Sequence, residues 1–184
     1  MRIAIAGASG TGKTTLARAI SEKYNIPLNP VGARSVALEM GFDNPYDVDK
    51  AGKRVEFQKR LFEAKRDWEL AHHEFVTDRS YLDNLTYCTL HMAEHLEEGA
   101  IDTFTAAMSR YDLIFWLPRG HIQRLDDGIR KTNLEYHRMY EFILWQLLLR
   151  AERTADLGVV RQPGGSLETR LESAFEDIQE ICGR

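Results

Sequence analysis

Short apolar runs alternate along the chain with longer stretches in which apolar residues recur at helical spacing. The runs that predict buried strands are residues 3–6, Phe75–Asp78, residues 113–117 and residues 159–160. The spacing between them predicts helices over Lys13–Tyr24, residues 48–72, 81–98, 101–109 and 134–153, and a last helix from Leu167. Strands that alternate with helices favour an α/β fold, with a mostly parallel sheet covered by helices on both faces.

Composition narrows the class of protein further. With 184 residues and no linker or repeat, residues 1–184 form a single domain. Lys and Arg number 24 against 28 Asp and Glu, so the net charge of −4 argues against a nucleic-acid partner. The apolar runs are too short to span a membrane. Cys88 and Cys182 form no paired motif, which fits a reducing compartment, and we expect a cytoplasmic protein.

Residues 7–14 match the phosphate-loop pattern G-x-x-x-x-G-K-[ST] in full. Glycines allow the backbone to fold around phosphates, Lys13 can reach the β- and γ-phosphates, and the Thr14 hydroxyl can ligate Mg²⁺. The pattern follows a predicted strand and opens a predicted helix, as this chemistry requires. The ATP-binding residues expected here are Gly7, Ser9, Gly10, Thr11, Gly12, Lys13, Thr14 and Thr15.

Two classes of phosphate-loop protein fit poorly. The chain has no N-K-x-D with which a GTPase reads guanine. A motor or AAA-type ATPase is expected to end an apolar strand in paired acids, whereas residues 113–117 are followed by Pro118.

The sequence Asp78-Arg79-Ser80, at the end of a predicted strand, resembles the signature of thymidylate kinases and deoxynucleoside kinases. This resemblance implies a three-layer phosphate-loop kinase fold with a lid. It also implies that Asp78 holds Mg²⁺ or activates the acceptor, and that Arg79 clamps phosphates. An exposed Asp–Arg pair at a strand end is the alternative.

Residues 119–132 resemble the lid of ribosylnicotinamide kinases and related small kinases, through Asp126-Asp127-Gly128 followed by Arg130. The resemblance implies that Arg124 and Arg130 close over the nucleotides as catalytic residues and that Asp127 contacts the acceptor. A solvated charged loop is the alternative. Residues 159–166 resemble the adenine-side loop of the same superfamily, which implies that Arg161 stacks on the purine and that Gly164 lies beside it.

We expect the acceptor site between residues 31 and 68. Arg34 could bind an acceptor phosphate, and Phe57-Gln58 resembles the base-reading segment of deoxynucleoside kinases. An amide can donate and accept at a base edge while an aromatic ring stacks on it. A core Phe57 and a solvated Gln58 remain the alternatives. Tyr81 and Asp83 are also expected to line this pocket.

Together these features predict an ATP- and Mg²⁺-dependent kinase whose acceptor is a deoxynucleoside monophosphate. The alternative is a nucleoside or ribosylnicotinamide kinase. Its hydroxyl acceptor must lose a proton, and Asp78 would then act as the general base. A nucleotide-sensing regulatory ATPase is a more distant alternative. Similar kinases include phage-encoded ones and are often homodimers, which is an implication of the resemblance only.

Overall fold

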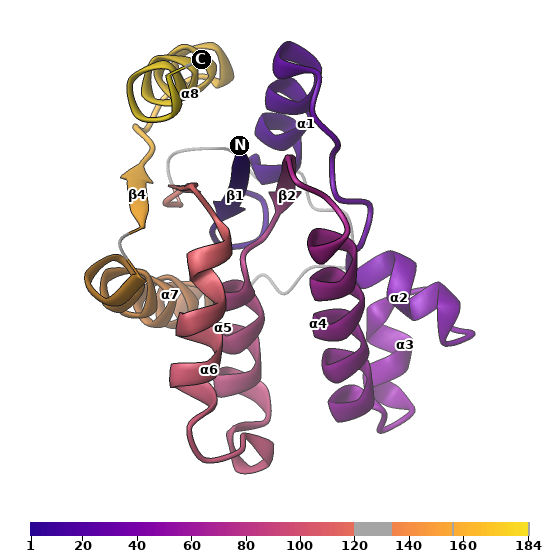
Figure 1. The fold of residues 1–184 in the computed structure, drawn as a ribbon. Coiled ribbons are helices and arrows are strands. Elements are labelled where there is room, and N and C mark those ends of the chain that lie inside the picture. Colours follow the sequence, from indigo (N-terminus) through magenta and orange to yellow (C-terminus); the bar gives the residue numbers. More distant parts are fainter. Residues whose placement is uncertain (120–133, 156, 184) are drawn as a thin grey trace.

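Four parallel strands form the centre of the computed structural model, which describes residues 1–119, 134–155 and 157–183 (Figure 1). The strands run in the order β2-β1-β3-β4. Leu28 adds a single parallel bridge to Val76 of β2. The strands are β1 (Arg2–Ala6), β2 (Phe75–Asp78), β3 (Leu113–Trp116) and β4 (Gly158–Arg161).

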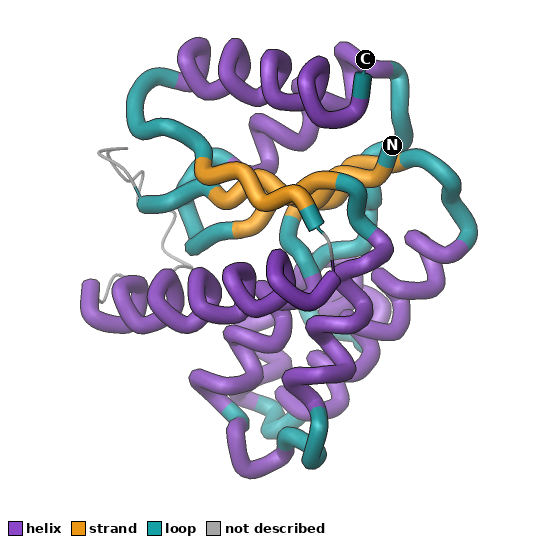
Figure 2. Tube along the Cα trace, turned by 60° about the vertical axis from the view of Figure 1, so that its left-hand side comes forward, coloured by secondary structure: helices purple, strands orange, loops and turns teal. Residues whose placement is uncertain are grey.

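Helices cover both faces of this sheet (Figure 2). On one face, α1 (Lys13–Tyr24) and α8 (Leu167–Cys182) pack over strand residues such as Ile5 and Phe115. The opposite face carries Ala4, Phe75 and Ile114 and a larger helical layer. That layer contains α4 (Arg54–Leu70), α5 (Tyr81–His91), α6 (Ala100–Ala107) and α7 (Leu134–Ala155). The three-layer α/β fold predicted from the alternating pattern is therefore confirmed.

The predicted helix over residues 48–72 is wrong in one respect, because the structure divides it. A helix α3 (Pro45–Lys50) begins after Asn44, whose side chain accepts from two backbone N–H groups. The chain then turns at Gly52, whose φ of 70° is a left-handed conformation that glycine adopts at little cost, before α4 starts. A further helix, α2 (Ala33–Glu39), packs with α3 and α4 around Phe57 and was not predicted.

The predicted helix over residues 81–98 also ends early. Its regular part, α5, stops at His91, and the 3₁₀ turns Ala93–His95 and Met108–Arg110 flank α6. The expected break at Gly99 is confirmed, since Gly99 precedes α6 with a φ of 80°.

Two expectations from the sequence concern the cysteines and the lack of a membrane-spanning segment. Cys88 and Cys182 are not disulfide-bonded to each other, and burial raises the pKa of the Cys88 thiol to about 11. None of the helices in the described ranges is long and apolar enough to cross a membrane.

Helix α4 carries a buried ion pair on the side that faces β2, near the carboxyl end of that strand. Lys65 Nζ is 3.1 Å from Glu69 Oε1 and also donates to the Thr77 hydroxyl. Glu69 is fully buried and accepts further hydrogen bonds from Tyr81 and Tyr111. Because each charge is enclosed, the pair holds α4 against β2 only while both partners remain.

We expect Lys65→Met to lower the free energy of unfolding by about 3–5 kcal/mol, because it leaves the Glu69 carboxylate buried without its cation. Adding Glu69→Gln should restore part of this loss, since the charge is then gone and an acceptor for the tyrosines remains. Urea unfolding measures both variants. Arg60→Met, which breaks an exposed pair with Glu56, is the control and should change stability little. A double variant less stable than Lys65→Met would contradict this account.

Candidate functional site

The phosphate loop connects β1 to α1 through three glycines with positive φ. Gly7 has a φ of 146°, and a Cβ atom there would lie 2.5 Å from the Leu117 carbonyl oxygen. Gly10 and Gly12 have φ values of 81° and 89°. Gly7 is thus required both by its backbone conformation and by the close approach of the segment that follows β3.

The side chains of Thr11 and Lys13 turn inward, toward the backbone of the loop. Lys13 Nζ donates to the Ala8 carbonyl at 2.5 Å, and the Thr11 hydroxyl donates to the same oxygen at 3.0 Å. Lys13 is 5% exposed, whereas Thr14 and Thr15 are exposed at the start of α1. The first turn of α1 carries no acidic residue. The N–H groups of this first turn and the lysine therefore create an environment suited to an anion.

Asp78 reaches this loop because β1 and β2 are parallel and in register. Ile5 pairs with Asp78 at the carboxyl end of the sheet, and the Thr14 hydroxyl donates to Asp78 Oδ2 at 2.5 Å. The other carboxylate oxygen, Oδ1, is buried and has no hydrogen-bond partner in the described part of the chain. A hydroxyl beside a carboxylate with an unused oxygen is a donor set that suits Mg²⁺, so these residues fit the ion expected from the sequence.

Arg79 follows directly, in a conformation that few non-glycine residues adopt. Its φ is 83°, and its N–H donates to the Ile5 carbonyl at 2.9 Å. The half-exposed guanidinium lies 3.5 Å from Asp83 Oδ1 and donates to the Tyr140 hydroxyl at 3.2 Å. Burial opposes its charge, but Tyr140 and the nearby carboxylates outweigh that effect and raise the pKa of Arg79. A strained backbone at this position is typical of functional sites.

The Asp83 carboxylate joins the loop to the Asp78-Arg79-Ser80 segment. Asp83 Oδ1 accepts from Gly7 N–H at 3.1 Å and from the Tyr140 hydroxyl at 3.1 Å. Oδ2 accepts from Ser80 N–H and the Ser80 hydroxyl, each at 2.9 Å. Asp83 is 1% exposed, so it supports the site from beneath and does not line a pocket as expected. Its spacing from Ser80 is a capping box, a signal that sequence reasoning could have used.

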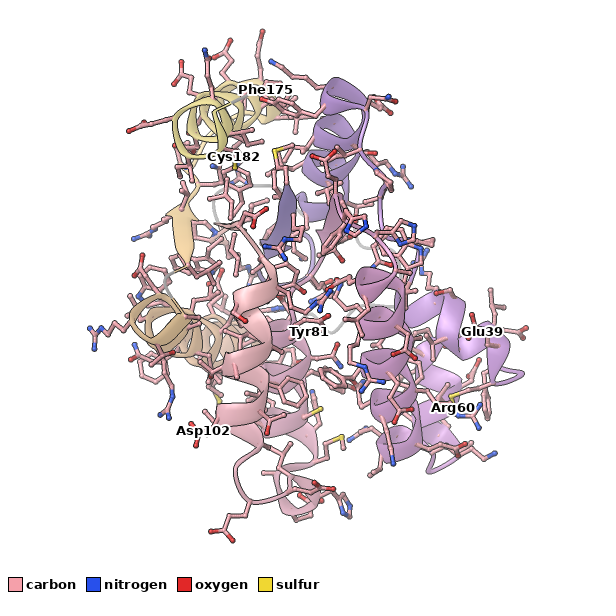
Figure 3. The ribbon with its side chains drawn as sticks, in the orientation of Figure 1. Glu39, Arg60, Tyr81, Asp102, Phe175 and Cys182 are labelled. Atoms are coloured by element: carbon pink, nitrogen blue, oxygen red, sulfur yellow. The ribbon has the colours of Figure 1, made fainter. Side chains whose placement is uncertain are left out.

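The residues expected to bind an acceptor are not brought together. Phe57 is 3% exposed and packs with Val36 and Val48, so its ring lies in a core. Gln58 is buried and accepts from Asn84 Nδ2 at 2.8 Å, which contradicts a solvated side chain. Tyr81 is fully buried between α4 and α5, where its hydroxyl donates to Glu69 (Figure 3). This corrects the expectation that Tyr81 lines a pocket. Arg34 is exposed on α2, with no ion pair in the part described.

Most of the predicted lid falls outside the described residues, including Arg124, Asp127 and Arg130. On the adenine side, the Arg161 guanidinium lies 5.1 Å from the centre of the Trp116 ring, which stacks on Trp145. Gly164 is exposed in the turn after β4.

Arg170 is a residue that sequence reasoning missed. It comes from α8, is 3% exposed, and donates from Nη1 to the Thr11 carbonyl at 2.8 Å. No local pattern marks it, because a lone arginine in an amphipathic helix ordinarily faces solvent.

We expect Gly7→Ala to lower the free energy of unfolding by about 1–3 kcal/mol and to abolish nucleotide binding, because the methyl group meets backbone and the φ is strained. Gly32→Ala is the matched control, since Gly32 has an extended φ and a Cβ atom there would meet nothing within 4 Å. Urea unfolding and a fluorescent-nucleotide titration measure both effects. A Gly7→Ala protein as stable as Gly32→Ala would refute the steric argument.

Several solved structures share this fold. Deoxyadenosine kinase from M. mycoides, solved with dCMP and dCDP, matches with a TM-score of 0.66 and 15% identity over 98% of this chain and 100% of that one. Shikimate kinase from Aquifex aeolicus matches with a TM-score of 0.66 and 16% identity, covering 99% and 98%. NadR in complex with NR matches with a TM-score of 0.70 and 18% identity, covering 100% of this chain and 50% of that one.

No curated protein matches the sequence. A family model described as an AAA domain, AAA_28, matches residues 2–170. That description stands although neither β2 nor β3 ends in the paired acids expected of an AAA-type ATPase. The phosphate loop, the parallel sheet and helices α1 to α7 lie within the matched residues. The chain therefore belongs to the AAA_28 family of P-loop domains, with the fold of small-molecule kinases.

Proposed function

We propose that this chain is an ATP-dependent kinase that phosphorylates a nucleoside or a nucleotide. The observation that carries the proposal is the contact between Thr14 and Asp78, which joins the phosphate loop to a carboxylate with one unused oxygen. A phosphate loop alone would support any nucleotide-binding role. A carboxylate held beside it can also serve a second substrate, which a kinase requires.

The residues of the loop would bind and orient ATP. Backbone N–H groups of residues 8–14 would cradle the phosphates, since the Gly7 N–H is engaged by Asp83, and Lys13 would leave the Ala8 carbonyl to pair with the β- and γ-phosphate oxygens. The Thr14 hydroxyl and the Asp78 carboxylate would hold Mg²⁺. When bound, this ion neutralises charge on the phosphates. Arg79, half-exposed and anchored to Asp83, is in our proposal the cation that clamps a phosphate oxygen from the β2 side.

Asp78 also bears on the choice of acceptor. For a hydroxyl acceptor, the Asp78 carboxylate would take the proton as the oxygen attacks phosphorus. A monophosphate acceptor needs no base, but it needs cations that are free to bind it. In α4, Arg54 is paired with Asp49, and Lys65 with Glu69.

Because these two cations are engaged, our proposal prefers a nucleoside over the deoxynucleoside monophosphate preferred from the sequence, although Lys53 and Lys59 form no ion pair among the described residues. Arg34 is the observation that keeps the monophosphate as a second candidate, since it is exposed and unpaired in the described part. Gln58 is 7% exposed and its carbonyl is engaged by Asn84, so in our proposal it could offer an acceptor base only its amide N–H groups.

We expect Asp78→Asn to lower kcat by about 100-fold or more while the Kd for ATP changes far less, because the amide cannot take a proton and ligates Mg²⁺ poorly. Asp43→Asn, at an exposed carboxylate of the α2–α3 loop, is the matched control and should leave both values unchanged. Steady-state kinetics and a nucleotide titration test this. Near-normal turnover of Asp78→Asn would remove Asp78 from the proposed machinery.

A coupled phosphoryl-transfer assay with Mg-ATP identifies the acceptor. The panel contains the common nucleosides, their deoxynucleoside monophosphates and ribosylnicotinamide, and we expect turnover with nucleosides. If monophosphates are the acceptors instead, Arg34→Ala should raise their KM about 10-fold or more without a matching fall in kcat. ATP binding without transfer to any member of the panel would contradict the kinase proposal and favour a regulatory ATPase.

A further inference from the structure

Arg170 on α8 is a buried cation for which the described residues offer no counter-ion. It is 3% exposed, forms no ion pair there, and burial lowers the pKa of its guanidinium. Nη1 donates to the Thr11 carbonyl, whereas Nε and Nη2 are buried with no hydrogen-bond partner. A buried guanidinium without a counter-ion stabilises a fold less than an apolar side chain of similar volume, which would avoid the cost of desolvating the charge. Stability alone therefore does not explain an arginine at this position.

The electrostatic surroundings of Arg170 make this cost larger. The Thr11 carbonyl that it contacts lies one residue before Gly12, the N-cap of α1. Arg170 itself follows the first turn of α8, which begins after the N-cap Ser166. The guanidinium therefore lies near the N-terminal, positive ends of α1 and α8, which pack on the same face of the sheet. Lys13 adds a further positive charge, so this region is arranged to be completed by an anion.

The contact also determines how one peptide group of the loop is oriented. None of the peptide bonds between described residues is cis. In a trans peptide the C=O and N–H groups point in opposite directions. Because Arg170 holds the Thr11 carbonyl, the Gly12 N–H must point away from α8. That N–H donates to no group among the described residues, so it is available to a phosphate oxygen.

We propose that Arg170 is a positioning residue of the phosphate loop, which holds the Thr11–Gly12 peptide so that the Gly12 N–H faces the nucleotide phosphates. A cation on the carbonyl also polarises the peptide and makes its N–H a stronger donor. Arg170 does not touch the nucleotide in this arrangement, because its two unpaired nitrogens are enclosed by protein. The inference rests on the proposed role of the loop in binding ATP.

Arg170→Met and Arg170→Lys test the proposal in the full-length chain. We expect Arg170→Met to weaken ADP binding about 10-fold or more, which is the effect of losing a hydrogen bond to a charged group. The KM for ATP should rise by a similar factor, with a smaller change in kcat. Arg170→Lys keeps the charge and one donor to Thr11, so its affinity should lie between those of Arg170→Met and the parent protein.

Phe175→Ala is the matched control for a merely structural role. Phe175 projects from α8 toward α1 and packs against Tyr24 (Figure 3). Its removal should loosen the docking of α8 and lower the urea midpoint without changing the Kd for ADP. If Phe175→Ala weakens ADP binding as much as Arg170→Met, the effect of Arg170 is a general loosening and the proposal is wrong.

The remaining outcomes separate this inference from the kinase proposal. ADP affinity of Arg170→Met within twofold of the parent would overturn the inference, and the kinase activity would stand. If Arg170→Met does not fold, the same criterion is applied to Arg170→Lys. A parent protein that binds ADP but transfers no phosphoryl group would overturn the kinase proposal alone. Lys13→Ala identifies loop-dependent binding in each case, because it removes the lysine that contacts the β- and γ-phosphates.

Discussion

The site depends on one buried carboxylate. Asp83 accepts from the N–H of Gly7, from both donors of Ser80 and from Tyr140, so it joins the start of the phosphate loop, the end of β2 and helix α7. A fully enclosed carboxylate is stable only when its oxygens are saturated with donors, as they are here. This requirement holds three distant segments in one arrangement, while the parallel register of β1 and β2 brings Asp78 to Thr14.

The helical layers on the two faces of the sheet have different parts in this arrangement. On the face of α1 and α8, the loop is supported by Arg170 from behind. On the other face, the Lys65–Glu69 pair and the buried tyrosines fix α4 against β2 and α5. Asp78 lies between these two supports, at the carboxyl edge of the sheet, where α/β folds bind their ligands. Few charged side chains of the described residues are buried, and among them Lys65, Glu69 and Asp83 have charged or hydrogen-bonding partners.

The family is described as an AAA domain, whereas the similar solved structures are kinases; both kinds of protein contain a phosphate loop. That loop binds triphosphates in any context, so it cannot by itself distinguish a motor from a kinase. A carboxylate beside Thr14 does not distinguish them by itself, because P-loop ATPases also hold Mg²⁺ with the loop hydroxyl and a strand-end Asp. In our proposal the distinction lies in the pairing of Asp78 with the strained Arg79, which suits transfer to a second small molecule.

Sequence alone determined the alternation of strands and helices, the phosphate loop and the candidate Asp78-Arg79-Ser80 segment, because each rests on local periodicity or on a short motif with a fixed mechanism. It did not separate α3 from α4, since one glycine turn interrupts a continuous helical pattern. Only the tertiary structure decided that Tyr81 and Phe57 are buried, that Gln58 pairs with Asn84, and that Arg170 reaches Thr11. These contacts join residues 26 to 159 positions apart or depend on which face of a helix is enclosed, and no local pattern records that.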